Sequence, residues 1–272
     1  MDYDIDNWDG IKVPQMEYTY KGKYEMKDIS SYSTIYDVLA KDPKDISREE
    51  VCGIVEMKES NKVVCDFINH QLIRNDNPYL IRNCFMCLLE CGDENTLPTL
   101  LEVLRQDNAF RKFHFDGLER EYITPLLYKW CKDNPEALLS YLLEPGLNTW
   151  FKTLVLESLA VIANTYPEAR EDMFSMLEKV LPAYKEDLYS GERKICDGNV
   201  VGFALLIPIA LWAEEYIPVI EEYCASGLVD YGIIGKIQYV RRDIRKHKVF
   251  YDIPANNAFD ILTKAQGKLP WF

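Results

Sequence analysis

The stretch LLECGDENTLPTLLEVL, residues 88–104, decides the fold, because it reads as two apolar helices joined by a short acidic turn. The first helix is expected to end at Gly92-Asp93, and the second restarts at the Leu97-Pro98 step. Proline suits a first helical turn, because its missing N–H would have no partner there and its fixed φ angle matches the helix. The stretch therefore predicts two helices packed side by side as antiparallel neighbours.

The same plan recurs at three other places in the chain. IALWAEEYIPVIEEYC (209–224) also turns through acidic residues and restarts at an apolar-proline step. YKWCKDNPEALLSYLLE (128–144) and LAVIANTYPEAREDMFSMLEKV (159–180) restart at Pro135 and Pro167. Each pair has more apolar surface than two helices can bury, so neighbouring pairs are expected to stack. The repeats predict an all-α fold, an α-α superhelix built as a solenoid of antiparallel helix pairs.

Helical periodicity extends over most of the chain after residue 45. Ser47, followed three residues later by Glu50, predicts a capping box that opens the segment SREEVCGIVEMK. No long strand-like segment interrupts the pattern. The predicted helices cover residues 47–57, 61–74, 78–91, 95–106, 117–132, 135–144, 148–164, 167–183, 198–213, 216–226, 233–247 and 257–266.

Two segments do not fit the repeat pattern. Residues 1–45 form an aromatic-rich N-terminal arm, in which alternation around Tyr18 and Tyr20 allows either a small hairpin or an arm packed on the first helices. Residues 184–199, YKEDLYSGERKICDGN, predict a long surface loop. We therefore predict two parts, the arm over 1–45 and a helical repeat domain over 46–272.

The helix junctions are similar to HEAT repeats. The run IPVIEEYCASGLVDYGIIG (217–235) resembles a family of uncharacterised bacterial HEAT-like helical proteins, and the resemblance covers about residues 46–250. It implies a fold but no established activity. Some members of that family end in a cysteine-rich zinc-binding tail, whereas this chain ends in AQGKLPWF, so that metal module is not carried over.

Composition and charge restrict the classes of partner. The formal net charge of −13 and the pI near 4.8 disfavour a phosphate-binding face, so nucleic acid is not expected as a partner. The longest uncharged stretch, residues 200–213, is shorter than the roughly 20 apolar residues that cross a bilayer. The first ten residues hold four aspartates and no lysine or arginine, unlike a secretory signal. Eight scattered cysteines are typical of reduced thiols, which favours the cytoplasm.

Cys84, Cys87 and Cys91 lie in the segment CFMCLLEC, a spacing that would allow thiolates to share a zinc ion. The same residues form one apolar stripe along a predicted helix, and cysteine is commonly buried. No second CxxC or nearby histidine supplies a fourth ligand. We therefore interpret the three cysteines as core residues and expect no metal and no cofactor.

His114 is the best placed of three histidines for chemistry, because Asp116, Glu119 and Glu121 follow it closely. This group supports the alternative hypothesis of a metal-dependent hydrolase centred on His114. The competing interpretation is an ordinary helix entry, where acidic residues favour the first turn. The sequence contains no nucleophile elbow, phosphate-binding glycine loop or dinucleotide fingerprint, so no catalytic residue is predicted.

The segment KIQYVRRDIRKHK (236–248) is the one basic cluster. It suits either capture of an acidic partner or phosphate, or pairing with a helix dipole and acidic neighbours, and the second interpretation is favoured. Second helices of HEAT-like pairs usually line a concave face. This places Glu102, Glu178, Glu221 and Glu222 in a predicted acidic groove that binds a partner segment.

Three functions remain open at this point. The first is a protein–protein interaction or scaffold module whose acidic concave groove binds another protein, with no nucleic acid and no membrane as partner. The second is the hydrolase centred on His114. The third is a structural subunit of a larger assembly, with Trp8, Trp271 and Phe272 as exposed aromatic residues.

Overall fold

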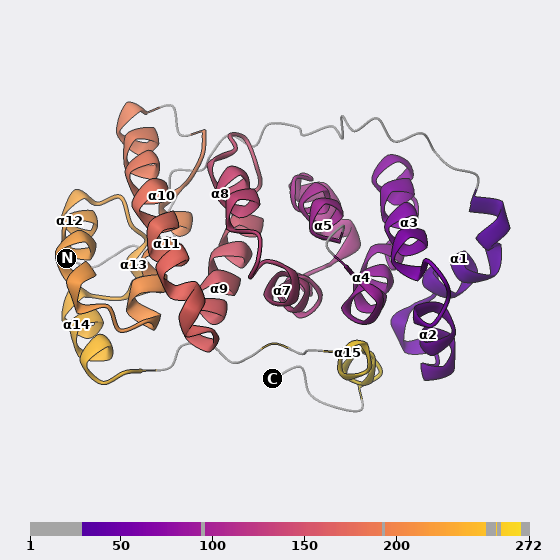
Figure 1. Cartoon of the computed structure of the whole chain (residues 1–272). Coiled ribbons are helices and arrows are strands. Elements are labelled where there is room, and N and C mark those ends of the chain that lie inside the picture. The colour runs from indigo at the N-terminus through magenta and orange to yellow at the C-terminus, as the bar shows by residue number, and fades with distance from the viewer. Residues whose placement is uncertain (1–28, 94–95, 192–193, 249–253, 255–256, 268–272) are drawn as a thin grey trace. The chain divides into compact units, whose positions relative to one another are not determined.

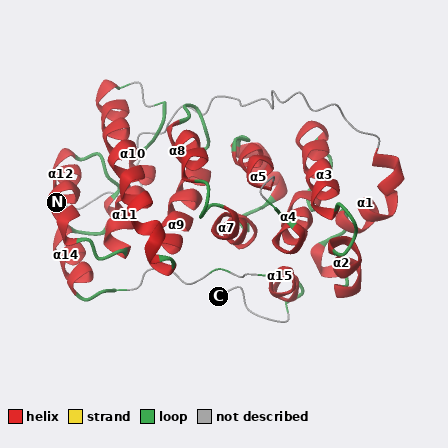
Figure 2. Cartoon of the chain, viewed as in Figure 1, coloured by secondary structure: helices red, strands yellow, loops and turns green. Residues whose placement is uncertain are grey.

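A computed structural model describes residues 29–93, 96–191, 194–248, 254 and 257–267 of the chain. These residues form helices, turns and loops, and no strand occurs among them (Figure 2). The all-α prediction is therefore confirmed over this part of the chain. The predicted hairpin around Tyr18 and Tyr20 lies outside the described residues, as do Trp8, Trp271 and Phe272.

The described residues fall into two compact units. The first unit contains those up to Asp133 together with the last helix, and the second contains those from Asn134 to Lys248. Helices of the first unit are η2 (Ile29–Tyr32), α1 (Ser33–Leu39), η3 (Pro43–Asp45), α2 (Arg48–Val55), α3 (Ser60–Arg74), α4 (Leu80–Cys91), α5 (Thr96–Leu104), α6 (Asn108–His114), α7 (Glu119–Trp130) and α15 (Ala258–Ala265). Those of the second are α8 (Pro135–Leu143), α9 (Thr149–Thr165), η4 (Pro167–Ala169), α10 (Arg170–Ser190), α11 (Gly198–Ala210), η5 (Glu214–Tyr216), α12 (Ile217–Ser226), α13 (Tyr231–Ile234) and α14 (Ile237–Arg245).

Helix α4 forms the centre of the first unit and packs against α2, α3, α7 and α15 (Figure 1). Every residue from Leu80 to Leu89 is buried, as expected of a helix surrounded by others. The one amide in this run, Asn83, donates its side-chain nitrogen to the carbonyl oxygens of Leu39 and Lys41, both at 2.8 Å. This polar group therefore ties the end of α1 to the core.

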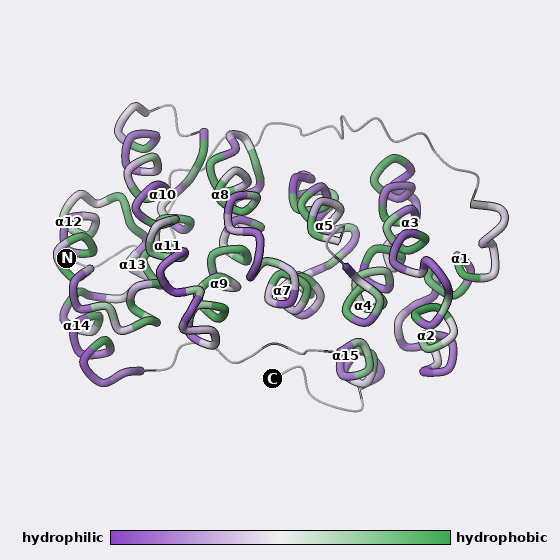
Figure 3. The backbone as a smooth tube through the Cα atoms, viewed as in Figure 1, coloured by the Kyte–Doolittle hydropathy of each residue, from purple (hydrophilic) through white to green (hydrophobic). Residues whose placement is uncertain are grey.

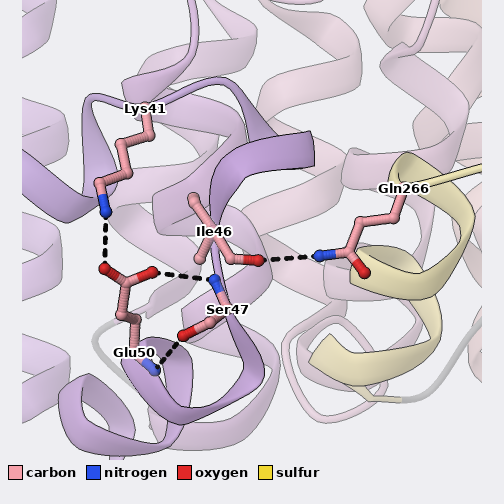
Figure 4. A network of polar contacts seen from close by, with 5 residues as sticks. All are labelled: Lys41, Ile46, Ser47, Glu50 and Gln266. Carbon is pink, nitrogen blue, oxygen red and sulfur yellow. Dashed lines mark hydrogen bonds and ion pairs between the residues drawn. The ribbon is translucent and has the colours of Figure 1, made fainter.

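The predicted capping box opens α2 (Figure 4). The Glu50 amide donates to Ser47 Oγ at 3.1 Å, and the Ser47 amide donates to Glu50 Oε2 at 2.8 Å. Lys41 Nζ lies 2.6 Å from the other Glu50 oxygen, and this hydrogen bond lowers the pKa of Glu50. Gln266, which follows α15, donates to the Ile46 carbonyl at 2.8 Å and so ties the C-terminal helix to the start of α2.

Helices α9 and α11 form the core of the second unit and pack closely on each other. All residues from Phe151 to Ala163 of α9 are buried, and α11 also contacts α10, α13 and α14. Pro208 lies inside α11, near the end of an apolar run. No helix in the described part of the chain is both long enough and apolar enough to cross a bilayer.

Lys152 is a fully buried cation in the middle of this core. Its ammonium donates to the carbonyl oxygens of Leu142 at 2.9 Å, Glu144 at 2.7 Å and Ile195 at 2.7 Å. Two of these acceptors belong to the C-terminal end of α8, where a helix dipole favours positive charge. Burial lowers the pKa of Lys152 to about 8. The side chain thus links α8, α9 and the segment before α11.

Asp187 of α10 holds the same segment from the other side. Its carboxylate accepts the backbone N–H groups of Lys194 at 2.9 Å, Ile195 at 2.8 Å and Cys196 at 3.2 Å. Together with Lys152, it binds both the donors and the acceptors of this stretch of backbone. A chain segment without regular structure is thereby fixed to the core.

The loop predicted over 184–199 is wrong for its first part, because α10 continues to Ser190 and ends where Gly191 adopts a φ of 76°. Tyr184 and Leu188 face the core, and this burial stabilises the added turns. The single helix predicted over 233–247 is two helices, since Gly235 adopts a φ of 74° between α13 and α14. Helices α1 and α6, each of seven residues, were not predicted.

Candidate functional site

Three short helices at the end of the second unit, α12, α13 and α14, form the candidate site. Pro218 opens α12, and Gly227 ends it with a φ of 71°. Asp230 then caps α13 by accepting the Gly232 N–H at 2.6 Å. With Gly235 after α13, these turn residues bring the chain back so that α14 packs against α12.

A cavity of about 960 Å³ lies among these helices. Its apolar wall contains side chains from all three, namely Cys224, Ala225, Tyr231, Ile237 and Tyr239. Its polar wall consists of Glu221, Asp230 and Lys236. Sites that bind ligands have volumes of about 300 to 1,000 Å³ and combine apolar walls with a few polar groups, so the cavity has the size and lining of a binding site.

Of the two tyrosines in the apolar wall, Tyr231 is held by a hydrogen bond and Tyr239 is exposed. The Tyr231 hydroxyl donates to the carbonyl oxygen of Cys224, which fixes its ring against α12. Tyr239 is 46% exposed, and the guanidinium of Arg242 lies 5.0 Å from the centre of its ring. An exposed tyrosine beside a cavity presents both apolar area and a hydroxyl to an incoming chain.

A second cavity of about 390 Å³ lies along α14. Four cations line it, Arg241, Arg242, Arg245 and Lys246, together with Gln238 and Ile237. Ile237 lines both cavities, so the two adjoin. Figure 3 shows α14 as largely hydrophilic, interrupted by the apolar residues that face the core.

The acidic residues of α12 are paired with cations. Glu221 accepts from Arg241 Nε at 2.8 Å, and Glu222 pairs with Lys185 of α10. The hydrogen bond from Lys185 to Glu222 raises the pKa of that lysine. Since each carboxylate has a basic neighbour, α12 carries little net negative charge on this face.

Three of the four residues of the predicted acidic groove belong to the second unit. Glu221 and Glu222 lie on α12, and Glu178 lies exposed on α10 of the same unit. Glu102 belongs to α5 of the first unit, where Arg105 pairs with it at 2.7 Å. A groove lined by all four carboxylates stays a prediction, and Glu221 is the one that lines a cavity described above.

His114 lies in the first unit and is fully buried. Its Nε2 lies 2.7 Å from Asn75 Oδ1, and the ring packs against Phe110 with centroids 4.2 Å apart. Burial, together with the nearby Arg82, lowers the pKa of His114 to about 4. The imidazole is therefore neutral at pH 7 and out of reach of solvent.

The three carboxylates that follow His114 in the sequence differ in their surroundings. Glu119 pairs with Arg111 at 2.5 Å, and burial raises the pKa of Glu121. Asp116 is exposed in the turn after α6, with a φ of 49°. Among the described residues, no group of three or more histidine, cysteine or acidic side chains is placed to hold a metal ion.

The cysteines of the CFMCLLEC segment lie on α4. Cys84 and Cys87 are completely buried, and burial raises the pKa values of both thiols and of Cys91. Raised pKa values keep these groups as thiols rather than thiolates, and the thiolate is both the metal ligand and the nucleophile. Their arrangement is that of core residues.

Comparison with known proteins does not extend these observations. No family model, curated protein or solved structure matches this chain. The geometry of the α12–α14 site is therefore the basis for assigning a function. Sequence patterns did not indicate its tyrosines, since Tyr231 and Tyr239 come together only through the turn at Gly235.

Proposed function

We propose that the chain is a HEAT-like helical repeat protein that binds a segment of a partner protein in the α12–α14 cavity. The observation that carries the proposal is the cavity of about 960 Å³, with its apolar wall and the exposed Tyr239 at its edge. Partner proteins commonly anchor in such pockets through a few aromatic or aliphatic side chains, while polar groups surround the contact.

The repeat part of the proposal is supported by the positions of four prolines. Pro135, Pro167 and Pro218 lie at the first or second position of a helical element, and Pro98 lies within the first turn of α5. Proline is favoured there because it needs no N–H partner. These positions fit a duplicated helix-turn-helix plan of the HEAT type.

Because Glu221 and Glu222 are paired with cations, we propose that burial of an apolar side chain in the cavity, rather than attraction to these carboxylates, holds the partner. An acidic groove would attract a basic segment, but Arg241 and Lys185 already offset these two carboxylates. Exposed ion pairs contribute little, about 0 to 1 kcal/mol, whereas burying an apolar side chain contributes about 1.5 to 3 kcal/mol. The apolar cavity is therefore the better anchor.

A quantitative affinity capture tests the proposed function. The full chain, a Tyr239→Asp variant and a Tyr189→Asp control are immobilised at equal density, and recovered proteins are compared. Tyr189 is a matched control, since it is 60% exposed and lies on α10 of the same unit. We expect Tyr239→Asp to lose a partner that the control retains. Equal recovery by all three proteins, with the same thermal unfolding, would show that the cavity is not the binding site.

A further inference from the structure

The two adjoining cavities carry an excess of positive charge in a chain that is strongly negative. Their walls contain five cations, Lys236, Arg241, Arg242, Arg245 and Lys246, but only two carboxylates, Glu221 and Asp230. The whole chain has a formal net charge of −13. The site thus has the opposite sign to the protein as a whole, which favours a partner that complements it locally.

Several of these cations remain available to a partner. Arg241 pairs with Glu221, and Arg242 pairs with Asp243 at 2.8 Å. Lys236, Arg245 and Lys246 are exposed and have no ionic or hydrogen-bonding side-chain partner among the described residues. Lys236 lines the larger cavity, and the other two line the smaller one. Each of the two adjoining cavities is therefore lined by at least one free cation.

We propose that the partner segment is an acidic peptide, whose carboxylates pair with Lys236, Arg245 and Lys246 while an aromatic or aliphatic side chain enters the larger cavity. This inference rests on the proposed function and names the chemistry of its partner. The net charge of −13 repels a long polyanion, which favours a short acidic peptide over nucleic acid.

Fluorescence anisotropy on the full chain tests the acidic partner. The probe is a short fluorescein-labelled peptide in which aspartate and glutamate alternate with tryptophan and leucine, and its matched control replaces every acidic residue by its amide. We expect the acidic probe to bind more tightly, and its affinity to fall as salt is raised. An Arg245→Glu/Lys246→Glu variant is expected to weaken binding about tenfold or more, since it replaces attraction by repulsion.

The control variant Lys58→Glu/Lys62→Glu makes the same change in net charge on exposed residues of the first unit and is expected to bind normally. Equal binding of the acidic and amide probes, or of the wild type and the Arg245→Glu/Lys246→Glu variant, would overturn the acidic partner. The capture test changes Tyr239 and leaves Lys236, Arg245 and Lys246 in place, so its result separates failure of this inference from failure of the site.

Two other occupants give different outcomes. Residues 1–10 of the chain, MDYDIDNWDG, have the same acidic and aromatic character. If replacing their four aspartates by asparagine in the full chain tightens binding of the acidic probe, the chain's own segment is the occupant, and the assignment to a partner is overturned. Tighter binding of a labelled duplex oligonucleotide than of the peptide would also overturn it.

Discussion

Replacing Lys152 by methionine removes a buried cation that donates to three backbone carbonyls in the second unit. Hydrogen bonds from a charged donor contribute about 1.5 to 3 kcal/mol each. Leu142 keeps a second donor, the Tyr184 hydroxyl at 3.2 Å, but Glu144 and Ile195 lose the ammonium. Methionine has a similar shape and needs no solvation, so the substitution isolates the loss of charge and donors.

The expected magnitude follows from these opposing contributions. The shift of the Lys152 pKa from 10.5 to about 8 means that keeping the buried ammonium charged costs roughly 3 kcal/mol, which methionine relieves. The three lost hydrogen bonds outweigh this gain. We expect the Lys152→Met variant to lose about 3 kcal/mol of unfolding free energy, measured by urea denaturation at pH 7. The control Lys179→Met, an exposed residue of α10 in the same unit, should change it by less than about 0.5 kcal/mol.

The difference in unfolding free energy between wild type and Lys152→Met should also depend on pH. Between pH 8 and 10.5 the unfolded chain keeps a proton on Lys152 that the folded chain has lost. The contribution of Lys152 to the unfolding free energy therefore rises with pH in this range. The difference in unfolding free energy between wild type and Lys152→Met should therefore grow across this range. A difference that stays flat, or a Lys152→Met variant as stable as Lys179→Met at pH 7, would refute the reasoning.

Two further predictions concern the first unit. Gly92→Ala should destabilise the chain by about 1 to 3 kcal/mol in urea denaturation, because a Cβ there would lie 2.5 Å from the Leu88 carbonyl and 2.9 Å from the Trp130 ring; unchanged stability would contradict this packing. His114 should stay neutral down to about pH 4, so its contribution to stability is lost as pH falls from 6.5 to 4. NMR of the imidazole nitrogens checks this, and a ring that titrates near pH 6.5 would contradict its burial.

Local signals in the sequence predicted much of the helical structure. Ser47 and Glu50 formed the capping box they were expected to form, because that motif depends only on residues three apart. The end of α10 was missed, since the polar residues around Tyr184 resemble a loop, whereas burial of Tyr184 and Leu188 in the core stabilises these helical turns. Tertiary burial overrode local preference there.

The candidate site was less accessible to sequence reasoning. Glu221 was predicted to line an acidic groove; it lines the larger cavity, and its ion-pair partner Arg241, 20 positions further on, could not be identified from local sequence. Lys152 carried a weak signal as a lone cation in a long apolar run. Nothing local identified its acceptors, since Ile195 comes close only after the core has formed.

Hydrogen–deuterium exchange on the full chain, with and without the captured partner, tests the central claim most directly. If the α12–α14 cavity binds the partner segment, exchange should slow across Ile217–Arg245 and stay unchanged in α3 of the first unit. The Tyr239→Asp variant should show no such slowing. Unchanged exchange across Ile217–Arg245, or slowing confined to the first unit, would contradict the proposed binding site.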